Sequence, residues 1–491
     1  MSRGIAALAG AERDRIALVC DETRLTYADL DAAINRMAHA FADVGVQPGD
    51  RVAVMCHNRP EVFVAWNAAA RLGAYVVPLG YRSTAGELDY LLTDSRASVL
   101  VHDCPEVVDN FVVPGTVHAV WHVDDDELRS GPSTPPRTDF LGATVTTMNY
   151  TSGTTGRPKG IERPAPAPAT EYAGNTFMQF WGFTSDDVHL LTGPAYHTAP
   201  GNYAQMHLME GARVVIMPRF SADECLQLIE QERVTTAHMV PANFVRILDV
   251  DWRAHDRSSV RKVLHAAAPC PIPVKERILE VFPSGSVWEY LGMSEGMATV
   301  ISPDEWLEHP GSVGRPFPGV SVRVYDDNGN VLAPGEIGSI YVSTVPGYEP
   351  FRYHGAPEKT ASVWRDGHYT VGDLGWLDRD GYLYVADRRT DLVISGGVNI
   401  YPAEVEQSLV SHDDVIDAAV FGLPDERMGQ RVHAVVELRR GAQCSADELF
   451  EHLRAQLAHF KVPRTMEFLA ELPREPTGKV RKRELREARI S

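Results

Sequence analysis

The string Tyr-Thr-Ser-Gly-Thr-Thr-Gly-Arg-Pro-Lys-Gly at residues 150–160 has the clearest chemical potential, and it follows a β-like run at 143–149. Its glycines permit tight turns and a close approach of a ligand to the backbone. Its Ser and Thr hydroxyls and Lys159 can donate hydrogen bonds to anionic oxygens. The string therefore predicts a phosphate-binding loop. It is not a Walker A loop, because Pro158 stands where that motif needs glycine and Gly160 follows the lysine.

Further short motifs follow in order along the chain. They are Glu-Tyr-Leu-Gly-Met-Ser-Glu-Gly at 289–296, Gly-Ser-Val-Gly-Arg-Pro at 311–316, Gly-Glu-Ile-Gly at 335–338, Tyr-Thr-Val-Gly-Asp-Leu-Gly at 369–375, Asp-Arg-Arg-Thr-Asp at 387–391 and Pro-Arg-Glu-Pro-Thr-Gly-Lys at 473–479. Each motif alone is weak. Their ordered combination resembles the adenylate-forming superfamily, which includes acyl-CoA synthetases, peptide-synthetase adenylation domains and luciferases. The resemblance extends over nearly the whole chain, from Thr26 to Glu487.

The resemblance implies an enzyme that uses ATP, Mg²⁺ and coenzyme A, with Lys479, Glu295 and His197 as catalytic residues. Lys479 would stabilise negative charge while a carboxylate attacks the α-phosphate. Glu295 and Thr151 would hold Mg²⁺, a hard cation that prefers oxygen ligands. His197 would lie between the acyl pocket and the thiol entrance. Considered without the resemblance, a lysine in an exposed turn is usually solvated, a lone glutamate lies at the surface, and a lone histidine is structural.

The resemblance also assigns residues to cofactor binding. The phosphates would be bound by Thr151, Ser152, Gly153, Thr154, Thr155, Gly156 and Lys159. The rest of the nucleotide would be surrounded by Ala267, Ala268, Tyr290, Gly292 and Ser294, with Asp373 and Arg388 binding the ribose hydroxyls. The pantetheine arm of coenzyme A would lie along Gly396 and Gly397. Thr390 would be the pivot about which a small domain rotates, so that one site serves both half-reactions.

Three positions depart from the family pattern. Leu291 stands where an aromatic ring usually stacks on adenine, and a lost stacking pair is worth about 0.5–1.5 kcal/mol. Thr390 replaces the more usual Asp or Lys, and Glu475 replaces a Thr close to Lys479. Together they raise the hypothesis that adenylation is impaired and that another enzyme supplies the acyl-adenylate.

The predicted elements belong to an α/β fold. Apolar spacing predicts helices at 26–44 and from 221 onward, and buried strands at 52–56 and 237–240. Strands that alternate with helices indicate parallel sheets. Near the C-terminus, Pro402 suits the start of a helix, residues 415–421 and 433–438 read as strands, and Ser445 with Glu448 forms a capping box. We expect a large N-terminal domain of several subdomains at 1–388 and a small mobile α+β domain at 389–491.

Composition limits the possible partners. A chain of 491 residues with a net charge of −19 is too long for one core and too acidic for general binding of nucleic acid or anionic membranes. The six cysteines are scattered without metal-ligand spacing, which favours reduced, buried thiols. No apolar run is long enough to cross a membrane, and no signal peptide is visible. A cytoplasmic location is expected.

The leading prediction is an AMP-forming acyl-CoA ligase acting on an apolar carboxylic acid, with fatty and bulky alicyclic acids the nearest by resemblance. A standalone adenylation enzyme that loads a carrier protein is the enzymatic alternative. A non-catalytic ligand binder is disfavoured, because Lys479 and Glu295 are both retained. The sequence leaves a homodimer open.

Overall fold

The structure, a computed structural model, describes residues 4–151, 158–164, 176–345, 350–475 and 478–490. The chain divides into two compact units. The first unit comprises Met1–His238, His255–Arg261 and Glu349–Thr360, and the second comprises Met239–Ala254, Lys262–Tyr348 and Ala361–Ser491. None of the described helices combines the length and apolar character that a membrane crossing requires.

A four-stranded parallel sheet forms one layer of the first unit, in the order β4-β3-β5-β6. Its strands are β3 (Arg51–Met55), β4 (Tyr75–Pro78), β5 (Val99–His102) and β6 (Ala119–His122). Val52 and Val54 of β3 join a buried cluster with α2 (Tyr27–Asp43) and α3 (Pro60–Arg71). Ala53 and Met55 point the other way, into a cluster with α4 (Ala85–Ser95). Helices therefore cover both faces, as parallel sheets require.

The first unit also contains a run of strands in the order β11-β9-β10-β1-β2. Their bounds are β1 (Ile16–Cys20), β2 (Thr23–Thr26), β9 (Val188–Leu191), β10 (Arg213–Ile216) and β11 (Thr236–Met239), with helices α1 (Ile5–Ala11), α7 (Thr176–Trp181), α8 (Thr198–Glu210) and α9 (Ala222–Gln231). Only the β1–β2 pair is antiparallel. Short elements complete this unit, namely α5 (Pro105–Val108), α6 (Asp126–Arg129), β7 (Asn149–Thr151), β8 (Lys159–Glu162) and β18 (Arg352–Tyr353).

Two sheets form the larger part of the second unit. One contains β12 (Lys262–His265), β13 (Val287–Met293), β14 (Gly296–Ile301) and β15 (Arg315–Pro316), with α10 (Pro241–Leu248), α11 (Ile272–Val281) and α12 (Pro303–Glu308) nearby in the sequence. The other sheet is antiparallel and contains β16 (Val322–Tyr325), β17 (Gly338–Ser343), β19 (Trp364–Arg365), β20 (His368–Tyr369), β21 (Asp373–Leu377) and β22 (Leu383–Arg388). Helix α13 (Pro357–Val363) precedes β19 in the chain.

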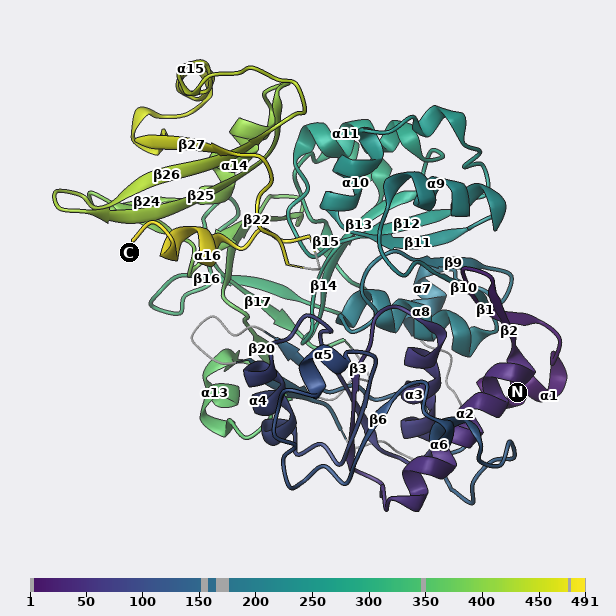
Figure 1. The fold of residues 1–491 in the computed structure, drawn as a ribbon. Coiled ribbons are helices and arrows are strands. Elements are labelled where there is room, and N and C mark those ends of the chain that lie inside the picture. Colours follow the sequence, from purple (N-terminus) through teal and green to yellow (C-terminus); the bar gives the residue numbers. More distant parts are fainter. Residues whose placement is uncertain (1–3, 152–157, 165–175, 346–349, 476–477, 491) are drawn as a thin grey trace. The chain divides into compact units, whose positions relative to one another are not determined.

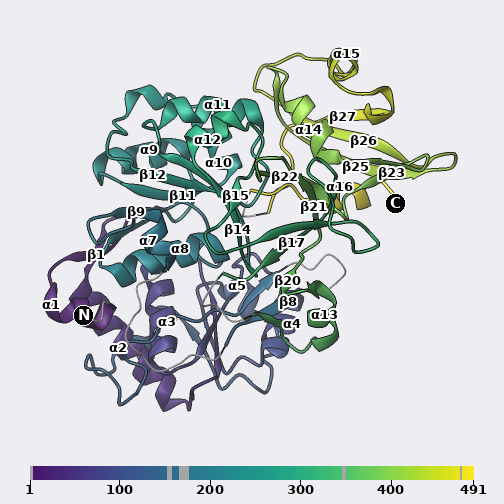
Figure 2. The same ribbon diagram turned by 180° about the vertical axis from the view of Figure 1, so that it is seen from behind.

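The C-terminal segment has a sheet of its own, seen from two sides in Figures 1 and 2. It comprises β23 (Val393–Ser395), β24 (Val398–Ile400), β25 (Val415–Asp425), β26 (Gly429–Leu438) and β27 (Thr465–Leu469), with α14 (Pro402–Val410), α15 (Ala446–Gln456) and α16 (Lys482–Glu487). Leu485 of α16 packs with Ala419, Phe421 and Val435 of the β25–β26 hairpin. This mixture of helices and a mostly antiparallel sheet is an α+β arrangement.

Most predicted elements occur within a few residues of their expected positions. Thr26 caps α2 by accepting the backbone N–H of Asp29, and Ser445 with Glu448 forms the predicted capping box of α15. The predicted strand 52–56 is displaced by one residue, and β25 and β26 both extend beyond their predicted bounds. All six cysteines are buried and free. The predicted α/β class is confirmed.

Three buried histidines lie in the first unit, His207 on α8, His189 on β9 and His238 on β11, and the rings of His189 and His207 stack. His207 donates Nδ1–H to the Tyr203 carbonyl at 2.7 Å, so its Nε2 accepts from the Thr236 hydroxyl at 3.1 Å. The Thr236 oxygen then accepts Nδ1–H of His189 at 3.0 Å. His238 stacks on the Tyr203 ring. Burial lowers the pKa of His207 to about 4 and that of His238 to about 3, and it also lowers the pKa of His189.

These neutral histidines predict acid lability. Histidines in the unfolded chain titrate near about 6.5, so the folded protein binds fewer protons than the unfolded one. The free energy of unfolding should therefore fall as the pH drops from about 6.5 toward 4, by on the order of 3 kcal/mol for a single histidine such as His207. Urea denaturation across this pH range measures it. His207→Gln should flatten the pH dependence and the exposed-site control His118→Gln should not; equal slopes would contradict the assignment.

Candidate active site

The ends of the predicted phosphate loop lie on a short hairpin of the first unit. β7 and β8 pair antiparallel, with Thr151 opposite Lys159. The connecting residues Ser152, Gly153, Thr154, Thr155 and Gly156 lie outside the described part of the chain. The Tyr150 hydroxyl donates to Asp94 at 2.7 Å, and the Tyr90 hydroxyl donates to the Pro158 carbonyl at 2.7 Å. These two bonds to α4 fix both ends of the loop.

Gly160 shows how closely this hairpin packs. A β-carbon at Gly160 would come within 2.3 Å of the Met148 Cε and 3.1 Å of the Tyr150 ring. Glycine is thus required here by close approach and not by an unusual backbone angle.

His197 lies at the N-terminal cap position of α8, also in the first unit. Its ring contacts the Tyr196 ring at a centroid separation of 4.2 Å. Its Nε2 is buried, and the described residues supply it with no hydrogen-bond partner. Burial lowers the pKa of His197 to about 4, so the imidazole is neutral at physiological pH. A neutral ring with a free Nε2 can contact an apolar ligand or accept one proton.

Asn58 holds the loop that carries His197, and it was not predicted. Its side-chain amide donates to the Gly193 and Met217 carbonyls, both at 2.9 Å, and its oxygen accepts the Ala195 N–H at 2.8 Å. Asn58 is buried and follows β3. A buried amide can use its donors and its acceptor only with suitably placed partners. The signal available in the sequence was a polar residue directly after a buried strand.

In the second unit, β13 and β14 form a hairpin whose turn carries Ser294 and Glu295. Glu295 is buried. The turn is closely packed, because a β-carbon at Gly296 would come within 2.4 Å of the Tyr369 hydroxyl. A β-carbon at Gly292 would come within 2.8 Å of the Tyr290 ring, which is itself buried. Tyr290, Gly292, Ser294 and Glu295 thus form one continuous segment.

Ala267 and Ala268 follow β12 in the same unit. Ala267 is exposed and adopts a positive φ of 77°, which is uncommon for a residue with a β-carbon. Such strain costs on the order of 1–3 kcal/mol and tends to occur at functional sites. The exposed position argues against tight core packing as the reason for the run of alanines.

Asp373 and Arg388 face each other across β21 and β22, and their side chains form an ion pair with Nε to Oδ1 at 3.2 Å. Asp373 is buried and Arg388 is half-buried. Burial and the charge of Arg388 lower the pKa of Lys479, while the charges of Glu475 and Asp391 oppose that shift. Lys479 is half-buried and follows Gly478, which has a positive φ of 83°. Asp373, Arg388 and Lys479 therefore share one electrostatic neighbourhood.

Gly396 and Gly397 form the two-residue turn between β23 and β24. Both have positive φ, 59° and 79°, as a type I′ hairpin turn requires. Both glycines are exposed, and so are the flanking Ile394 and Val398. The turn therefore presents bare backbone between two apolar side chains.

A buried charge cluster beside the predicted pivot was also missed. Asp387 accepts the backbone N–H groups of Arg388 at 2.7 Å and of Ala403 at 2.9 Å. Burial raises the pKa of Asp387, and the nearby Lys482 opposes this. Lys482 pairs with Glu406 at 2.7 Å, and burial raises the pKa of Glu406 to about 7. In the sequence, Asp387 stood in the motif at 387–391 without an assigned role, and Lys482 was not singled out.

The predicted site residues fall into two sets. Thr151, Lys159 and His197 belong to the first unit, and the others that the structure describes belong to the second. Thr151 and Glu295, the two predicted magnesium ligands, are therefore in different units. Both offer oxygen atoms, the donors that Mg²⁺ prefers. Within the second unit, the structure brings Asp373, Arg388 and Lys479 together.

Comparisons with known proteins identify the family. A family model described as AMP-binding enzyme matches residues 6–348, and a second, AMP-binding enzyme C-terminal domain, matches residues 404–479. Feruloyl-CoA synthase from an Amycolatopsis species is 38% identical over 94% of this chain and 94% of its own length. A fatty acid–[acyl-carrier-protein] ligase from Streptomyces coeruleorubidus is 33% identical over 95% of this chain and 93% of its own.

Among solved structures, the chain resembles o-succinylbenzoate CoA synthetase from Bacillus subtilis in complex with its acyl-adenylate intermediate. The TM-score is 0.83, with 30% identity over 99% of this chain and 98% of the other. The chain belongs to the AMP-binding enzyme family, which is the adenylate-forming superfamily that the motifs predicted. The predicted enzyme class, an AMP-forming acid–thiol ligase, is thereby confirmed.

Asn58→Ala tests the support of the His197 loop. The substitution leaves one backbone N–H and two carbonyls without their side-chain partner, so we expect a loss of about 2–3 kcal/mol in the free energy of unfolding. Urea denaturation measures it. Asn110→Ala is the matched control, because Asn110 makes an exposed bond to the Glu106 carbonyl. Equal stability of the two variants would contradict this role of Asn58.

Proposed function

We propose that this chain is an acyl-CoA ligase that uses ATP to convert an apolar carboxylic acid into its acyl-adenylate. It then transfers the acyl group to the thiol of coenzyme A, and it releases pyrophosphate in the first step and AMP in the second. Support comes from the family assignment, from the relative named as a CoA synthase, and from the solved relative that holds an acyl-adenylate.

One observation carries the proposal, namely the cluster of Asp373, Arg388 and Lys479. Asp373 is held by Arg388 and keeps further acceptor sites for the two ribose hydroxyls of the nucleotide. Lys479 is half-buried in the same neighbourhood. A partly desolvated cation stabilises developing negative charge more strongly than a solvated one. The cluster thus suits a reaction at the α-phosphate next to a bound ribose.

The remaining site residues would take the following roles. Residues 151–156 with Lys159 would bind the phosphates, and Ala267, Ala268, Tyr290, Gly292 and Ser294 would surround the adenine and α-phosphate. Mg²⁺, held by Glu295 and Thr151, would supply charge neutralisation for the phosphates. Gly396 and Gly397 would let the pantetheine arm approach the backbone. We place the domain boundary between residues 388 and 389, next to the pivot at Thr390.

The proposed preference for an apolar acid rests on the surroundings of His197. The ring is neutral, and its Nε2 has no polar partner among the described residues. The ring is already buried and uncharged, so an apolar acyl chain beside it removes no charge from water, whereas a polar acyl chain would lose hydrogen bonds with water. The fatty acid in the name of the Streptomyces coeruleorubidus relative is consistent with this choice.

The direct test combines the pure protein with Mg-ATP, coenzyme A and acids from short chains to bulky polycyclic rings. Mass spectrometry follows acyl-AMP and acyl-CoA, and a parallel series receives synthetic acyl-AMP instead of acid and ATP. Acyl-CoA from free acid is the expected result. Product from acyl-AMP alone would mean that adenylation is lost, and acyl-AMP without acyl-CoA would indicate a carrier-protein acceptor. No product in either series would refute the proposal.

Lys479→Ala separates the two half-reactions. Because Lys479 acts on charge that develops only during adenylation, acyl-AMP formation should slow by about 100–1000-fold. Thioester formation from supplied acyl-AMP should fall by less than about tenfold. Arg483→Ala on α16 is the control, since the Arg483 side chain is 84% exposed. Equal losses in both half-reactions would contradict the assigned role.

Leu291→Phe tests the missing adenine stack. Leu291 is half-buried on β13, so an aromatic ring there should restore a stacking contact. We expect the KM for ATP to fall by up to about tenfold, with little change in thioester formation from acyl-AMP. Leu307→Phe, at an exposed leucine of α12, is the control. An unchanged KM in both variants would show that position 291 does not contact adenine.

A further inference from the structure

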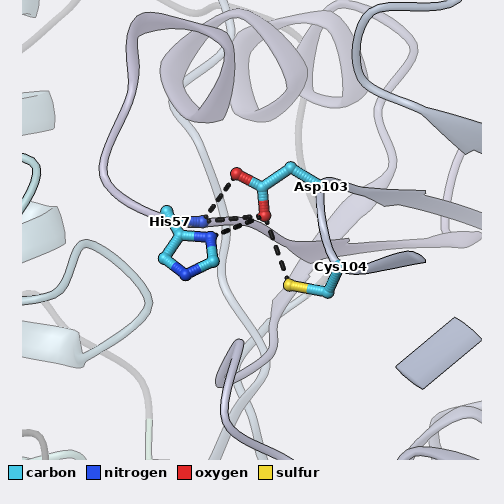
Figure 3. A group of neighbouring side chains, drawn as sticks. All are labelled: His57, Asp103 and Cys104. Atoms are coloured by element: carbon cyan, nitrogen blue, oxygen red, sulfur yellow. Dashed lines mark hydrogen bonds and ion pairs between the residues drawn. The ribbon is translucent and has the colours of Figure 1, made fainter. Parts of the chain in front are cut away.

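A cluster of three metal-ligand side chains contains none of the residues assigned above. His57, Asp103 and Cys104 each offer one ligand atom, and these atoms lie within 4.8 Å of one another. Figure 3 shows the Asp103 carboxylate between the His57 ring and the Cys104 sulfur. The same carboxylate oxygen is 3.1 Å from His57 Nδ1 and 3.3 Å from Cys104 Sγ. The chain thus brings together nitrogen, oxygen and sulfur donors from segments 46 residues apart.

Sheet geometry produces this cluster. His57 follows β3, and Asp103 and Cys104 follow β5. Strands β3 and β5 are parallel neighbours, and Met55 at the end of β3 pairs with His102 at the end of β5. Ligand sites in α/β sheets form where the carboxyl ends of such strands meet. The Asp103 carboxylate also accepts the backbone N–H of His57 at 3.1 Å, and the Cys104 N–H donates to His102 at 3.3 Å. The ligands are therefore oriented by the backbone.

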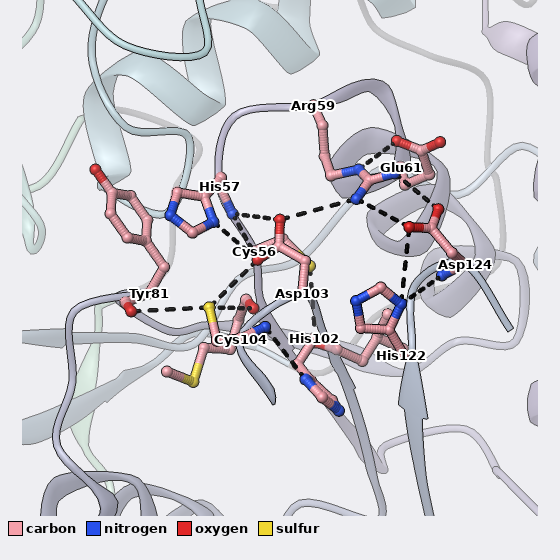
Figure 4. Close-up of polar contacts among 12 residues, drawn as sticks. Cys56, His57, Arg59, Glu61, Tyr81, His102, Asp103, Cys104, His122 and Asp124 are labelled. Carbon is pink, nitrogen blue, oxygen red and sulfur yellow. Dashed lines mark hydrogen bonds and ion pairs between the residues drawn. The ribbon is translucent and has the colours of Figure 1, made fainter. Parts of the chain in front are cut away.

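Neighbouring side chains support the same arrangement. The Tyr81 ring stacks on His57 at a centroid separation of 4.1 Å and fixes the plane of the imidazole, as seen in Figure 4. Arg59 is the nearest cation, 4.0 Å from Asp103. Its charge is balanced by Glu61 and Asp124, each at 2.8 Å. Residues that do not bind the metal themselves but hold its ligands in position are a common feature of metal sites.

We propose that His57 Nδ1, the Asp103 carboxylate and Cys104 Sγ bind one divalent cation of the zinc type. Tetrahedral zinc with ordinary bond lengths separates a nitrogen from an oxygen ligand by roughly 3.3 Å, and a sulfur from an oxygen ligand by roughly 3.5 Å. The separations of 3.1 and 3.3 Å need to widen only slightly. Mg²⁺ and Ca²⁺ are disfavoured, because they prefer oxygen ligands throughout.

Charge and access also suit this cation. A thiolate and a carboxylate balance a charge of +2, with the imidazole neutral. Without the metal, burial and the adjacent Asp103 raise the pKa of the Cys104 thiol, which donates to that carboxylate. Binding releases the thiol proton to solvent, while the His57 proton moves from Nδ1 to Nε2. The His57 side chain is 35% exposed, so a fourth ligand can come from water.

A second group, His412, Asp414 and Cys444, meets the same distance limit in the C-terminal segment. Its sulfur and imidazole Nε2 are 3.9 Å apart, and His412 Nδ1 accepts the backbone N–H of Asp414. Because Nδ1 accepts this bond, the neutral ring carries its proton on Nε2, the nitrogen that faces Cys444, so that nitrogen has no lone pair for a metal. The proposal is confined to the first cluster, and Cys444→Ser provides the matched control.

The test uses the full chain, stripped of metal by a chelator and kept reduced with a phosphine. Competition titration measures Zn²⁺ affinity, and Co²⁺ serves as a spectroscopic probe. We expect one site that gives a thiolate-to-cobalt charge-transfer band, and release of about one proton per Zn²⁺ in calorimetry with two buffers. Cys104→Ser and Asp103→Asn should weaken binding by more than about 100-fold. Cys444→Ser should leave it unchanged.

His57→Phe guards against misfolding as an explanation, because phenylalanine keeps the stack on Tyr81 and removes the ligand atom. It should fold, as judged by circular dichroism and thermal unfolding, and should lose the site. The proposal is overturned if the wild-type protein shows no charge-transfer band. It is also overturned if Zn²⁺ binds wild type and Cys104→Ser equally, or if only Cys444→Ser loses the metal.

Discussion

Parallel strands cannot be joined by a tight turn, so each must be followed by a connection that leaves the carboxyl edge of the sheet. This constraint places polar residues where they can meet. In the first unit, Asn58 follows β3 and the loop that carries His197 follows β9. In the second unit, Ala267 follows β12. Each unit thus concentrates its chemically useful side chains on loops, while alternating aliphatic residues hold the strands that position them.

Burial then determines how these loops are held. A polar group removed from water must find a partner, or it costs on the order of 1–3 kcal/mol. Asn58 uses both donors and its acceptor on three backbone groups. The stacked histidines His189 and His207 are instead linked by the Thr236 hydroxyl, which accepts from one ring and donates to the other and so fixes which nitrogen of each ring carries the proton. In both cases a requirement for hydrogen bonds becomes a means of fixing the backbone.

Local signals predicted the elements that local forces determine. The helix expected at 26–44 is α2, because its cap and its apolar spacing are properties of neighbouring residues. The strand predicted at 415–421 ended too early, before Gly422 and Pro424, two residue types that are disfavoured inside strands. Cross-strand pairing continues through both of them, with Pro424 opposite Gln430. Only the partner strand reveals this, and a single sequence does not show it.

The candidate site divides in the same way. Motifs singled out Asp373, Arg388 and Lys479, and the structure pairs Asp373 with Arg388, whose charge acts on Lys479. The motif at 387–391 contained Asp387 but gave no sign of its bond to Ala403, and no motif indicated the positive φ of Ala267, because long-range partners and backbone conformation decide them. The contact of His57 with Asp103 depends on the register between β3 and β5. The spacing of cysteines, which was the sequence criterion for metal binding, contains no information on that register.

The two bonds accepted by Asp387 have a kinetic consequence. This carboxylate bonds to Arg388 on one side of Thr390 and to Ala403 on the other. A rotation about Thr390 would keep the first bond and break the second, leaving a buried carboxylate and an amide briefly without each other. Breaking that bond adds to the barrier for leaving the arrangement described here. Asp387 would then act as a latch that lengthens the residence time of this arrangement.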